Sequence, residues 1–377
     1  MSRKFVYKVR KGTAVVGVGG GVTSPRPLRL SVLDLVPVRT DQTSADAVAA
    51  SRELARVADA AGYHRYWVAE HHNMPAVAAT NPPVLIALLA AATERIRVGS
   101  GGVMLPNHAP LVVAEQFSLL EAAFPGRIDL GLGRAPGTDP VTSWALRHGA
   151  GGVGEDAVAR FPQYVDEIIA MMDTAGVGLE VAGRTHPLRA TPVASGRAPV
   201  WLLGSSDYSA RLAAARGLPY VFAHHFSGQG TAEALALYRD QFQPSELCAE
   251  PRTFLTVNVA VAPTAQEAER LALPQLLAML TLRTGGPLGA QLLVEEAEDV
   301  AVPTEHERLL AAMRERWIIG DPGTAAHRVR ELAAGFDVDE VMVHPVAGAY
   351  AGTDPAAAPA RAETLRLLAE AAGGLDW

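Results

Sequence analysis

Short runs of apolar and β-branched residues alternate with longer stretches rich in Ala, Leu, Glu and Arg along most of the chain. The short runs are typical of buried parallel strands, and the longer stretches have the composition and spacing of amphipathic helices. We predict eight strands, over Leu28–Val38, Tyr63–Ala69, Ile96–Leu105, Arg127–Arg134, Val200–Gly204, Tyr220–His224, Thr253–Ala262 and Glu340–His344. We predict helices over Ser44–Ala61, Pro82–Ala92, Pro110–Ala123, Asp156–Met172, Ala265–Leu280, Thr304–Arg316 and Pro359–Ala372, with one more after each of the fifth and sixth strands.

The order of these elements predicts the fold. Alternating strands and helices indicate a parallel sheet, and eight such units favour closure into a single (β/α)8 TIM barrel, of the α/β class. The barrel should span residues 28–377, with a long insertion between strand 7 and strand 8. Two segments interrupt the alternation. We expect Pro136–Gly154 to be a long loop and Thr284–Pro303 to be a mobile lid, because the latter's glycines, prolines and acidic cluster offer little to bury.

Residues 1–27 precede the first strand, and we expect them to form a disordered N-terminal extension. Basic residues, among them Lys4, Lys8, Arg10 and Lys11, stand before a Gly-rich run of small apolar residues from Thr13 to Val22. A weak signal peptide has a similar pattern, although this run contains no leucine. A vector-derived or mis-started segment would also account for it.

Composition narrows the classes of function. Hydrophobic residues make up 49% of the 377 residues, enough for a large core, and the formal net charge is −7. No predicted helix carries a row of Lys and Arg along its length, so nucleic acid is not an expected partner. Cys248 is the only cysteine, which rules out an intrachain disulfide, and no apolar run reaches the length of a membrane span. We therefore expect a cytoplasmic protein that acts on a small molecule.

Polar residues and glycines gather where the predicted strands end. In a β/α barrel the carboxyl ends of the strands form the mouth that carries the active site. The residues at these ends are Asp34, Glu70, His71, His72, Gly101, Gly102, Arg134, Gly204, Ser205, Ser206, His224, His225 and His344. Each has an ordinary structural explanation, but their shared location predicts a functional site.

The histidines admit two interpretations. Adjacent strand residues point to opposite sides, so only part of Glu70–His71–His72 can face the mouth. A histidine there could act as a base or a hydrogen-bond donor, while capped structural histidines explain the sequence equally well. His224–His225 is better explained as a strand-end pair that faces two environments. A metal site is disfavoured because the H-x-H and H-E-x-x-H spacings are missing.

Gly204–Ser206 precedes a predicted helix, whose N-terminus would attract an anion. An ordinary helix cap explains the same residues. Arg134 favours the anion site if it reaches the same phosphate, since Arg binds phosphate bidentately; a surface salt bridge is its alternative role.

Glycines mark two further positions. Gly101 and Gly102 interrupt a strand, which indicates a bulge, a close approach to a ligand or a place where the barrel tapers. Gly131-x-Gly133 lacks the third glycine of a dinucleotide fingerprint, so the chain shows no nicotinamide site of its own.

Four stretches of the chain resemble the bacterial luciferase-like flavin monooxygenases. They are Trp67–Gly137, Pro199–Ala214, Leu218–Phe226 and Thr256–Ala272. Together with the first and last strands, the likeness covers nearly all of Leu28–Gly374. It looks most like the subgroup that includes tailoring oxygenases of natural-product pathways.

The resemblance implies a barrel that binds reduced flavin mononucleotide (FMNH2) at the strand ends. His71 matches the family's catalytic histidine, Glu70 its acidic neighbour, and Arg134 the arginine that holds the flavin phosphate. Gly204, Ser205 and Ser206 match the phosphate-cradling turn. Gly101 and Gly102 match a bulge under the isoalloxazine ring, and by this analogy we predict a cis peptide bond between them. Asp34, His224 and His344 are further candidates for substrate contacts.

The resemblance also implies a reaction: FMNH2 and O2 oxygenate a small organic substrate in a biosynthetic pathway. A separate flavin reductase would supply FMNH2, and barrel helices would form a homodimer. Luciferase itself has a cysteine where Gly133 stands here and a tryptophan in the region of His224, which weakens the expectation of aldehyde oxidation and light emission. The rival functions are hydride transfer with a reduced deazaflavin, non-catalytic flavin binding, and metal-dependent hydrolysis.

Overall fold

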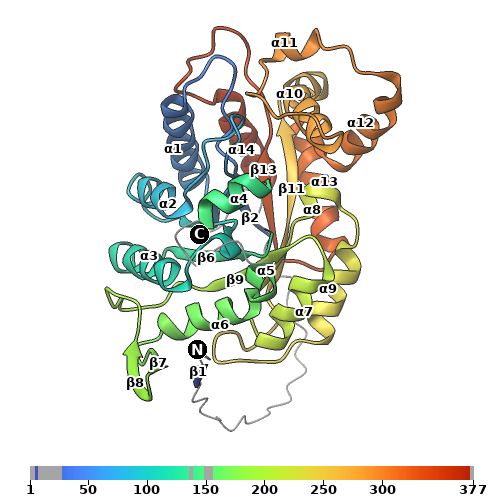
Figure 1. Ribbon diagram of the computed structural model, residues 1–377. Helices are drawn as coiled ribbons and strands as arrows, with labels where there is room; N and C mark the ends of the chain where they lie inside the picture. The colour runs from blue at the N-terminus through green and yellow to red at the C-terminus, as the bar shows by residue number, and fades with distance from the viewer. Residues whose placement is uncertain (1–4, 7–27, 136–138, 148–155, 374–377) are drawn as a thin grey trace.

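A closed barrel of parallel strands lies at the centre of the computed structural model, which describes residues 5–6, 28–135, 139–147 and 156–373 (Figure 1). Around the barrel the strands are β2 (Arg29–Asp34), β3 (Arg65–Val68), β4 (Arg97–Ser100), β6 (Ile128–Gly133), β9 (Val200–Gly204), β10 (Tyr220–Phe222), β11 (Thr253–Val261) and β13 (Glu340–Pro345). The pairing of β10 with β11 and of β13 with β2 closes the ring. The predicted TIM barrel is confirmed.

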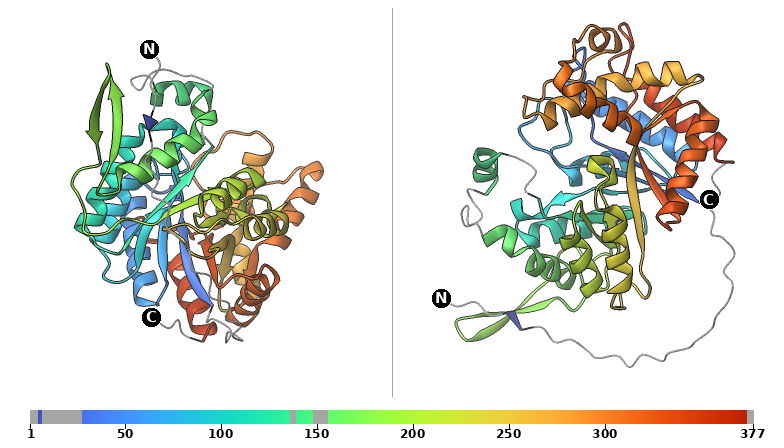
Figure 2. Two further views of the ribbon diagram at one scale, coloured as in Figure 1. Left: turned by 90° about the horizontal axis from the view of Figure 1, so that it is seen from below. Right: turned by 90° about the vertical axis from the view of Figure 1, so that its right-hand side faces the viewer.

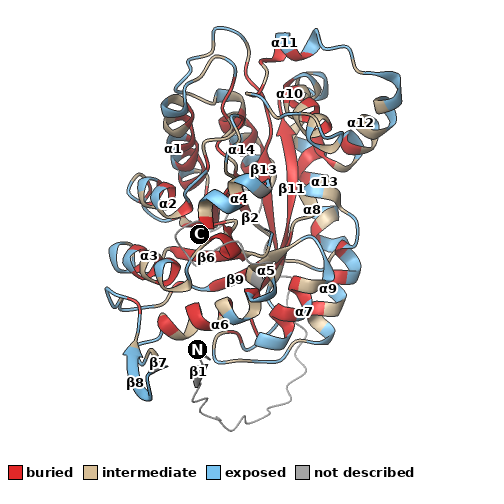
Figure 3. Ribbon diagram, in the orientation of Figure 1, coloured by how far each residue is buried: buried red, intermediate tan, exposed pale blue. Residues whose placement is uncertain are grey.

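Helices surround the barrel, and Figure 3 shows their buried faces turned toward the buried strands. The helices that alternate with the barrel strands are α1 (Ser44–Ala60), α2 (Pro82–Ala90), α3 (Pro110–Ala123), α6 (Phe161–Met171), α7 (Asp207–Arg216), α9 (Thr231–Asp240), α13 (Pro322–Gly335) and α14 (Pro359–Ala371). Local sequence sets where they begin: Thr43 and Asp46 form a capping box at α1, and proline occupies the first turn of α2 and α3. No helix in the described ranges is both long and apolar enough to cross a bilayer.

The predicted insertion between β11 and β13 forms a subdomain of its own. It comprises α10 (Ala265–Arg283), α11 (Val294–Glu298), α12 (Thr304–Arg316) and β12 (Ile318–Gly320), at the upper right of Figure 1. β12 pairs with the end of β11, and Leu276, Met313 and Trp317 share a core separate from that of the barrel. As expected, α10 packs against β11. The helix α13, which the sequence analysis did not predict, packs against both β11 and β13, as does α14.

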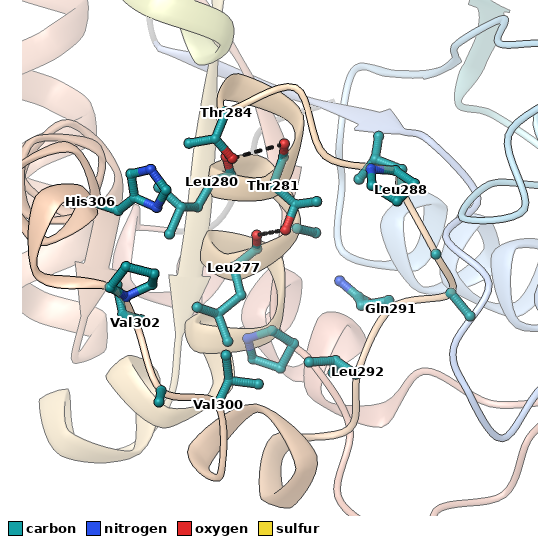
Figure 4. A pocket seen from close by; sticks show the side chains of 17 residues that line it. Leu277, Leu280, Thr281, Thr284, Leu288, Gln291, Leu292, Val300, Val302 and His306 are labelled. Atoms are coloured by element: carbon teal, nitrogen blue, oxygen red, sulfur yellow. Dashed lines mark hydrogen bonds between the residues drawn. The ribbon is translucent and has the colours of Figure 1, made fainter.

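The segment Thr284–Pro303 is more ordered than we expected. It contains α11, whose Val294 and Ala297 are buried, and the backbone of Gln291 pairs with Val38 and Thr40 after β2. The segment and the second half of α10 enclose a pocket of about 400 Å³ with a largely aliphatic lining (Figure 4). The premise that it has little to bury is therefore wrong for residues 291–297.

A second insertion follows β6. The predicted loop Pro136–Gly154 contains the helix α4 (Pro140–Arg147), and its residues 136–138 and 148–154 lie outside the described ranges. The predicted helix Asp156–Met172 is divided into α5 (Asp156–Ala159) and α6. An unpredicted hairpin, β7 (Val177–Val181) and β8 (Arg184–Leu188), projects from the barrel (Figure 2).

The N-terminal extension is described at one place only. There β1 (Phe5–Val6) pairs with β7 in antiparallel fashion. The rest of the segment for which we predicted disorder, residues 1–4 and 7–27, lies outside the described part of the chain.

Candidate functional site

The predicted strand Ile96–Leu105 is broken at Gly101–Gly102 into β4 and the short strand β5 (Val103–Met104). The peptide bond between the two glycines is cis, as predicted. A Cβ atom added to Gly102 would lie 2.8 Å from the carbonyl oxygen of Gly131, and one added to Gly101 would lie 2.9 Å from Leu33 Cδ1. The bulge therefore packs too closely against its neighbours for a side chain at either position.

Glu70 ties the end of β3 to this bulge. Its side chain is buried; Oε1 lies 2.7 Å from Nε2 of both His72 and His108, and Oε2 accepts a bond of 3.0 Å from the backbone N–H of Met104. Burial raises the pKa of Glu70, but the bonds from the two histidines outweigh it and lower the pKa to about 2. Glu70 is therefore ionised and links the end of β3 to the bulge. The sequence analysis did not identify its partners His108 and Met104.

The ligand-type atoms of Glu70, His72 and His108 lie within 4.8 Å of one another, a grouping that could hold a metal ion. The spacing rules missed it because His108 comes from a different loop than His72. Hydrogen bonds within the group already compensate the buried carboxylate. We therefore assign the group to holding the bulge.

His71 takes no part in the Glu70 group, in line with the expectation that only part of the trio shares one side. Its Nδ1 is enclosed and has no hydrogen-bond partner among the described residues. Burial lowers the pKa of His71, and the attraction of Glu70 offsets only part of that change. His71 is thus neutral at pH 7, with one nitrogen that a bound ligand could satisfy.

His225 and His344 lie near His71, with ring centroids 6.3 Å apart from each other. Nδ1 of His344 is 2.9 Å from Asn258 Oδ1, and Nδ1 of His225 bonds to Thr256 Oγ1. Burial, with a smaller contribution from neighbouring cations and histidines, lowers the pKa of His225 to about 4 and that of His344 to about 3. Three neutral histidines from three strand ends therefore meet at the mouth.

His224 does not join this cluster. It begins the short helix α8 (His224–Ser227) instead of ending a strand, its Nδ1 lies 2.8 Å from Thr231 Oγ1, and its ring packs against Phe336. The expectation that His224 and His225 face two environments is confirmed. His225, and not His224, lies at the mouth, so His225 replaces His224 as the candidate for a substrate contact.

Asp34 has a structural role and not the expected substrate contact. It is fully buried, and its carboxylate accepts bonds from Ser51, Tyr66 and Arg361. Burial raises the pKa of Asp34, but Arg361 and the hydroxyl donors outweigh it and lower the pKa. These bonds fasten α1 and α14 to the barrel and leave no side for a ligand.

Arg134 lies beside the turn after β9. Its guanidinium carbon is 4.0 Å from the centroid of the Tyr208 ring, in the first turn of α7. The N-cap Ser206 makes no side-chain capping bond, and a Cβ atom at Gly204 would come within 2.6 Å of Ser209 Oγ. The guanidinium and the open N-terminus of α7 thus present positive charge at one place, as an anion site requires.

A model of the family described as Luciferase-like monooxygenase matches residues 28–338. The chain belongs to the luciferase-like monooxygenase family. A luciferase-like monooxygenase of Escherichia coli is 40% identical over 319 residues, which cover 85% of this chain and 92% of that protein. An uncharacterized protein of Bacillus subtilis, YvbT, is 42% identical over 315 residues, 84% of this chain and 90% of its own length.

Solved structures agree with the family. Apo-MsnO8 superposes with a TM-score of 0.79 at 33% identity, covering 93% of this chain and all of that one. The oxygenating constituent of 3,6-diketocamphane monooxygenase from Pseudomonas putida, solved with FMN, has a TM-score of 0.67 at 19% identity over 93% of this chain and 99% of its own. An F420-dependent secondary alcohol dehydrogenase has a TM-score of 0.59 at 12% identity over 90% and 99%. The last two show the fold alone.

Proposed function

We propose that this monooxygenase is the oxygenase component of a two-component, FMNH2-dependent system in the cytoplasm that oxygenates a small organic substrate, with a role in natural-product biosynthesis. The observation that carries the proposal is the presence, at one barrel mouth, of an anion site at Arg134 and α7 and a cluster of neutral histidines around His71. The anion site suits the flavin phosphate, and the cluster lies where the reacting ring would be.

The residues at the mouth fit a bound flavin. Glycine at 101, 102 and 204 avoids close contacts of a Cβ atom with Leu33, Gly131 and Ser209. The enclosed Nδ1 of His71 lacks a partner within the described residues, a cost that a bound ring or substrate could remove. Arg134 and the N-terminus of α7 would hold the phosphate, as at other helix N-termini.

Bound FMNH2 would supply the electrons that reduce O2, so that one oxygen atom can reach the substrate and the other can leave as water. His71, neutral at pH 7, can accept a proton at its unprotonated ring nitrogen. Glu70 keeps the bulge in place without competing for that proton, because its own low pKa leaves it ionised. The insertion, with Thr284–Pro303 as its proposed lid, would exclude water.

A separate reductase follows from what the chain offers. The sequence contains no dinucleotide fingerprint, and Cys248 alone cannot form a redox-active dithiol. A relative from Acinetobacter baylyi, 38% identical over 82 residues that cover 22% of this chain and 23% of that protein, is named as the oxygenase component of a flavin-dependent trigonelline monooxygenase. We propose the same division of labour here, between copies of this chain and a flavin reductase.

Exposed aliphatic side chains support the proposed homodimer. Val84 and Leu88 on α2, with Val112 and Leu119 on the neighbouring α3, are 44–57% exposed. A patch of this kind on two adjacent barrel helices is typical of a subunit interface.

Anaerobic titration followed by mixing with oxygen tests the cofactor and the reaction. We expect the protein to bind FMNH2 more tightly than oxidised FMN, and bound FMNH2 to be reoxidised with kinetics distinct from those of free FMNH2. NADH with FMN should give no turnover until a flavin reductase is added. Tight binding of reduced F420 in preference to FMNH2 would replace the proposal with deazaflavin hydride transfer, and steady NADH oxidation by the protein alone would exclude the two-component arrangement.

A further inference from the structure

Asn258 fixes the tautomer of His344. Asn258 is buried in β11, and its Nδ2 donates a bond of 3.0 Å to the backbone carbonyl oxygen of His225. A carbonyl oxygen can only accept, so the NH2 group of the amide must face it. The amide oxygen is thereby turned to His344 and can only accept, so Nδ1 of His344 carries the proton.

The other nitrogen of His344 is therefore a bare acceptor. Burial lowers the pKa of His344 to about 3, so the ring is neutral and Nε2 keeps its lone pair at pH 7. His344 is only 4% exposed, yet its Nε2 keeps some exposed surface and has no hydrogen-bond partner in the described ranges. Because Nδ1 is bonded to Asn258, Nε2 is the nitrogen left for a ligand, on a ring whose centroid lies 6.3 Å from that of His225.

Thr256 holds the ring of His225. Its hydroxyl oxygen bonds to Nδ1 of His225 and lies 3.5 Å from the carbonyl oxygen of Phe222. A hydroxyl can donate or accept, so this bond fixes the position of the ring and not its tautomer. Burial lowers the pKa of His225 to about 4 and keeps it neutral. Of the two rings, the tautomer is therefore fixed for His344 alone.

We propose that His344, positioned by Asn258, is a specificity-determining residue that selects a substrate bearing an N–H or O–H group, such as a phenol, an alcohol or an amine. This inference rests on the proposed function and names its substrate class. A substrate that offers only acceptors, such as a ketone or an ether, would place lone pair against lone pair and leave Nε2 unsatisfied. Sites built to accept from a ligand hydroxyl reject analogues that lack it far more strongly than apolar pockets reject small changes of shape.

The tautomer is tested directly by nitrogen-15 NMR of histidine-labelled protein. We expect His344 to show a protonated Nδ1 and an unprotonated Nε2 from pH 6 to 8. Asn258→Leu should remove this signature, while Thr256→Ser, a change beside His225, should leave it in place. An Nε2-protonated His344 in the unaltered chain would overturn the inference.

Selectivity is tested with phenol and fluorobenzene, which have nearly the same shape, titrated calorimetrically into the full chain loaded with oxidised FMN. In His344→Phe the affinity for phenol should fall on the order of tenfold to a hundredfold, while that for fluorobenzene should change less than about threefold. His344→Gln, whose amide oxygen can accept, should restore part of the loss. Parallel changes for both probes, or a loss of FMN affinity alone, would contradict the proposed role. Neither measurement uses FMNH2 or O2, so a failure of the monooxygenase proposal would leave these results readable.

Discussion

The buried ion-pair cluster at the amino ends of the barrel strands differs from the histidine cluster at their carboxyl ends. At the amino ends of the strands, Arg65 donates bonds of 2.7 Å to both Asp129 and Glu340, and Trp67 Nε1 donates to Asp129. All are buried, and burial is outweighed by opposite charges that lower the pKa of Asp129 and raise that of Arg65. We call Arg65, Trp67, Asp129 and Glu340 the floor of the barrel; it is charged, and its polar groups bond to one another.

At the carboxyl ends, beside the ionised and well-bonded Glu70, the burial of three histidines is not fully offset by opposite charges. His71, His225 and His344 have lowered pKa values, and Nδ1 of His71 has no partner in the described part of the chain. The cluster at the amino ends therefore consists of charges that stabilise one another, whereas the three histidines at the carboxyl ends are neutral. The contrast agrees with the rule that function lies at the carboxyl ends of barrel strands, and it can be tested at each end separately.

Breaking the floor should have the largest effect. Asp129→Ala leaves the guanidinium of Arg65 buried with half of its ion pairs, and we expect a loss of about 3–5 kcal/mol in the free energy of unfolding. His71→Asn at the mouth should cost about 1 kcal/mol or less, because it removes no hydrogen bond given by the described residues. Urea denaturation of both variants measures the difference. Equal losses at the two ends would refute the comparison.

As the pH falls, the histidines of the mouth should lower the free energy of unfolding before the ion pairs of the floor are affected. The folded-state pKa of His344, about 3, lies below its unfolded value of about 6.5, so the unfolded chain takes up the proton first and stability falls as the pH drops from 6.5 toward 3. At pH 5 this loss amounts to about 2 kcal/mol relative to pH 7.5. His225 and His71 add to it in the same direction. Urea denaturation at the two pH values should show a smaller drop in His344→Phe; an unchanged drop would mean that His344 is protonated in the folded state.

Removing the cation of the anion site should affect binding and not folding. Arg134 follows the end of β6 and stacks on Tyr208, so Arg134→Ala leaves the barrel core intact. We expect FMN affinity to fall by about 1.5–3 kcal/mol, the value of a charge-assisted hydrogen bond, and riboflavin affinity to fall much less. Arg211→Ala, an exposed residue of α7 paired with Asp207, is the matched control. Equal losses for FMN and riboflavin would show that Arg134 does not hold the phosphate.

The sequence was informative where function depends on local pattern. The strand ends, the bulge at Gly101–Gly102 and the turn at Gly204–Ser206 each follow from a few neighbouring residues, and the structure contains all three. Strand alternation and the barrel rule limited the candidates to part of Glu70–His72 and to Arg134, and the family resemblance singled out His71 among them.

What the sequence concealed depends on pairings between distant segments. The sequence around Glu70 does not predict its contact with His108. Asn258 and Thr256 look like ordinary polar residues of a strand until β11 is placed beside β10 and β13. Asp34 was misjudged for the same reason, since Arg361 lies at the other end of the chain. The helix α13 was missed because the longer α10 seemed to fill its place behind β11.

The smallest effect is expected at the proposed lid, where the structure divides the segment in two. Gln291 is anchored to the loop after β2, and it is buried together with Leu293, Val294 and Ala297, whereas Gly285 and Gly289 have open space around them. Limited proteolysis should therefore begin between Thr284 and Ala290 and spare α11. Because closure would order only this short stretch, FMNH2 under anaerobic conditions should slow the cut by a few fold and not abolish it. Arg134→Ala, which binds the flavin weakly, should lose this protection at the same FMNH2 concentration. Cleavage within α11, or a rate that FMNH2 leaves unchanged, would show that the segment belongs to the rigid part of the insertion and closes over nothing.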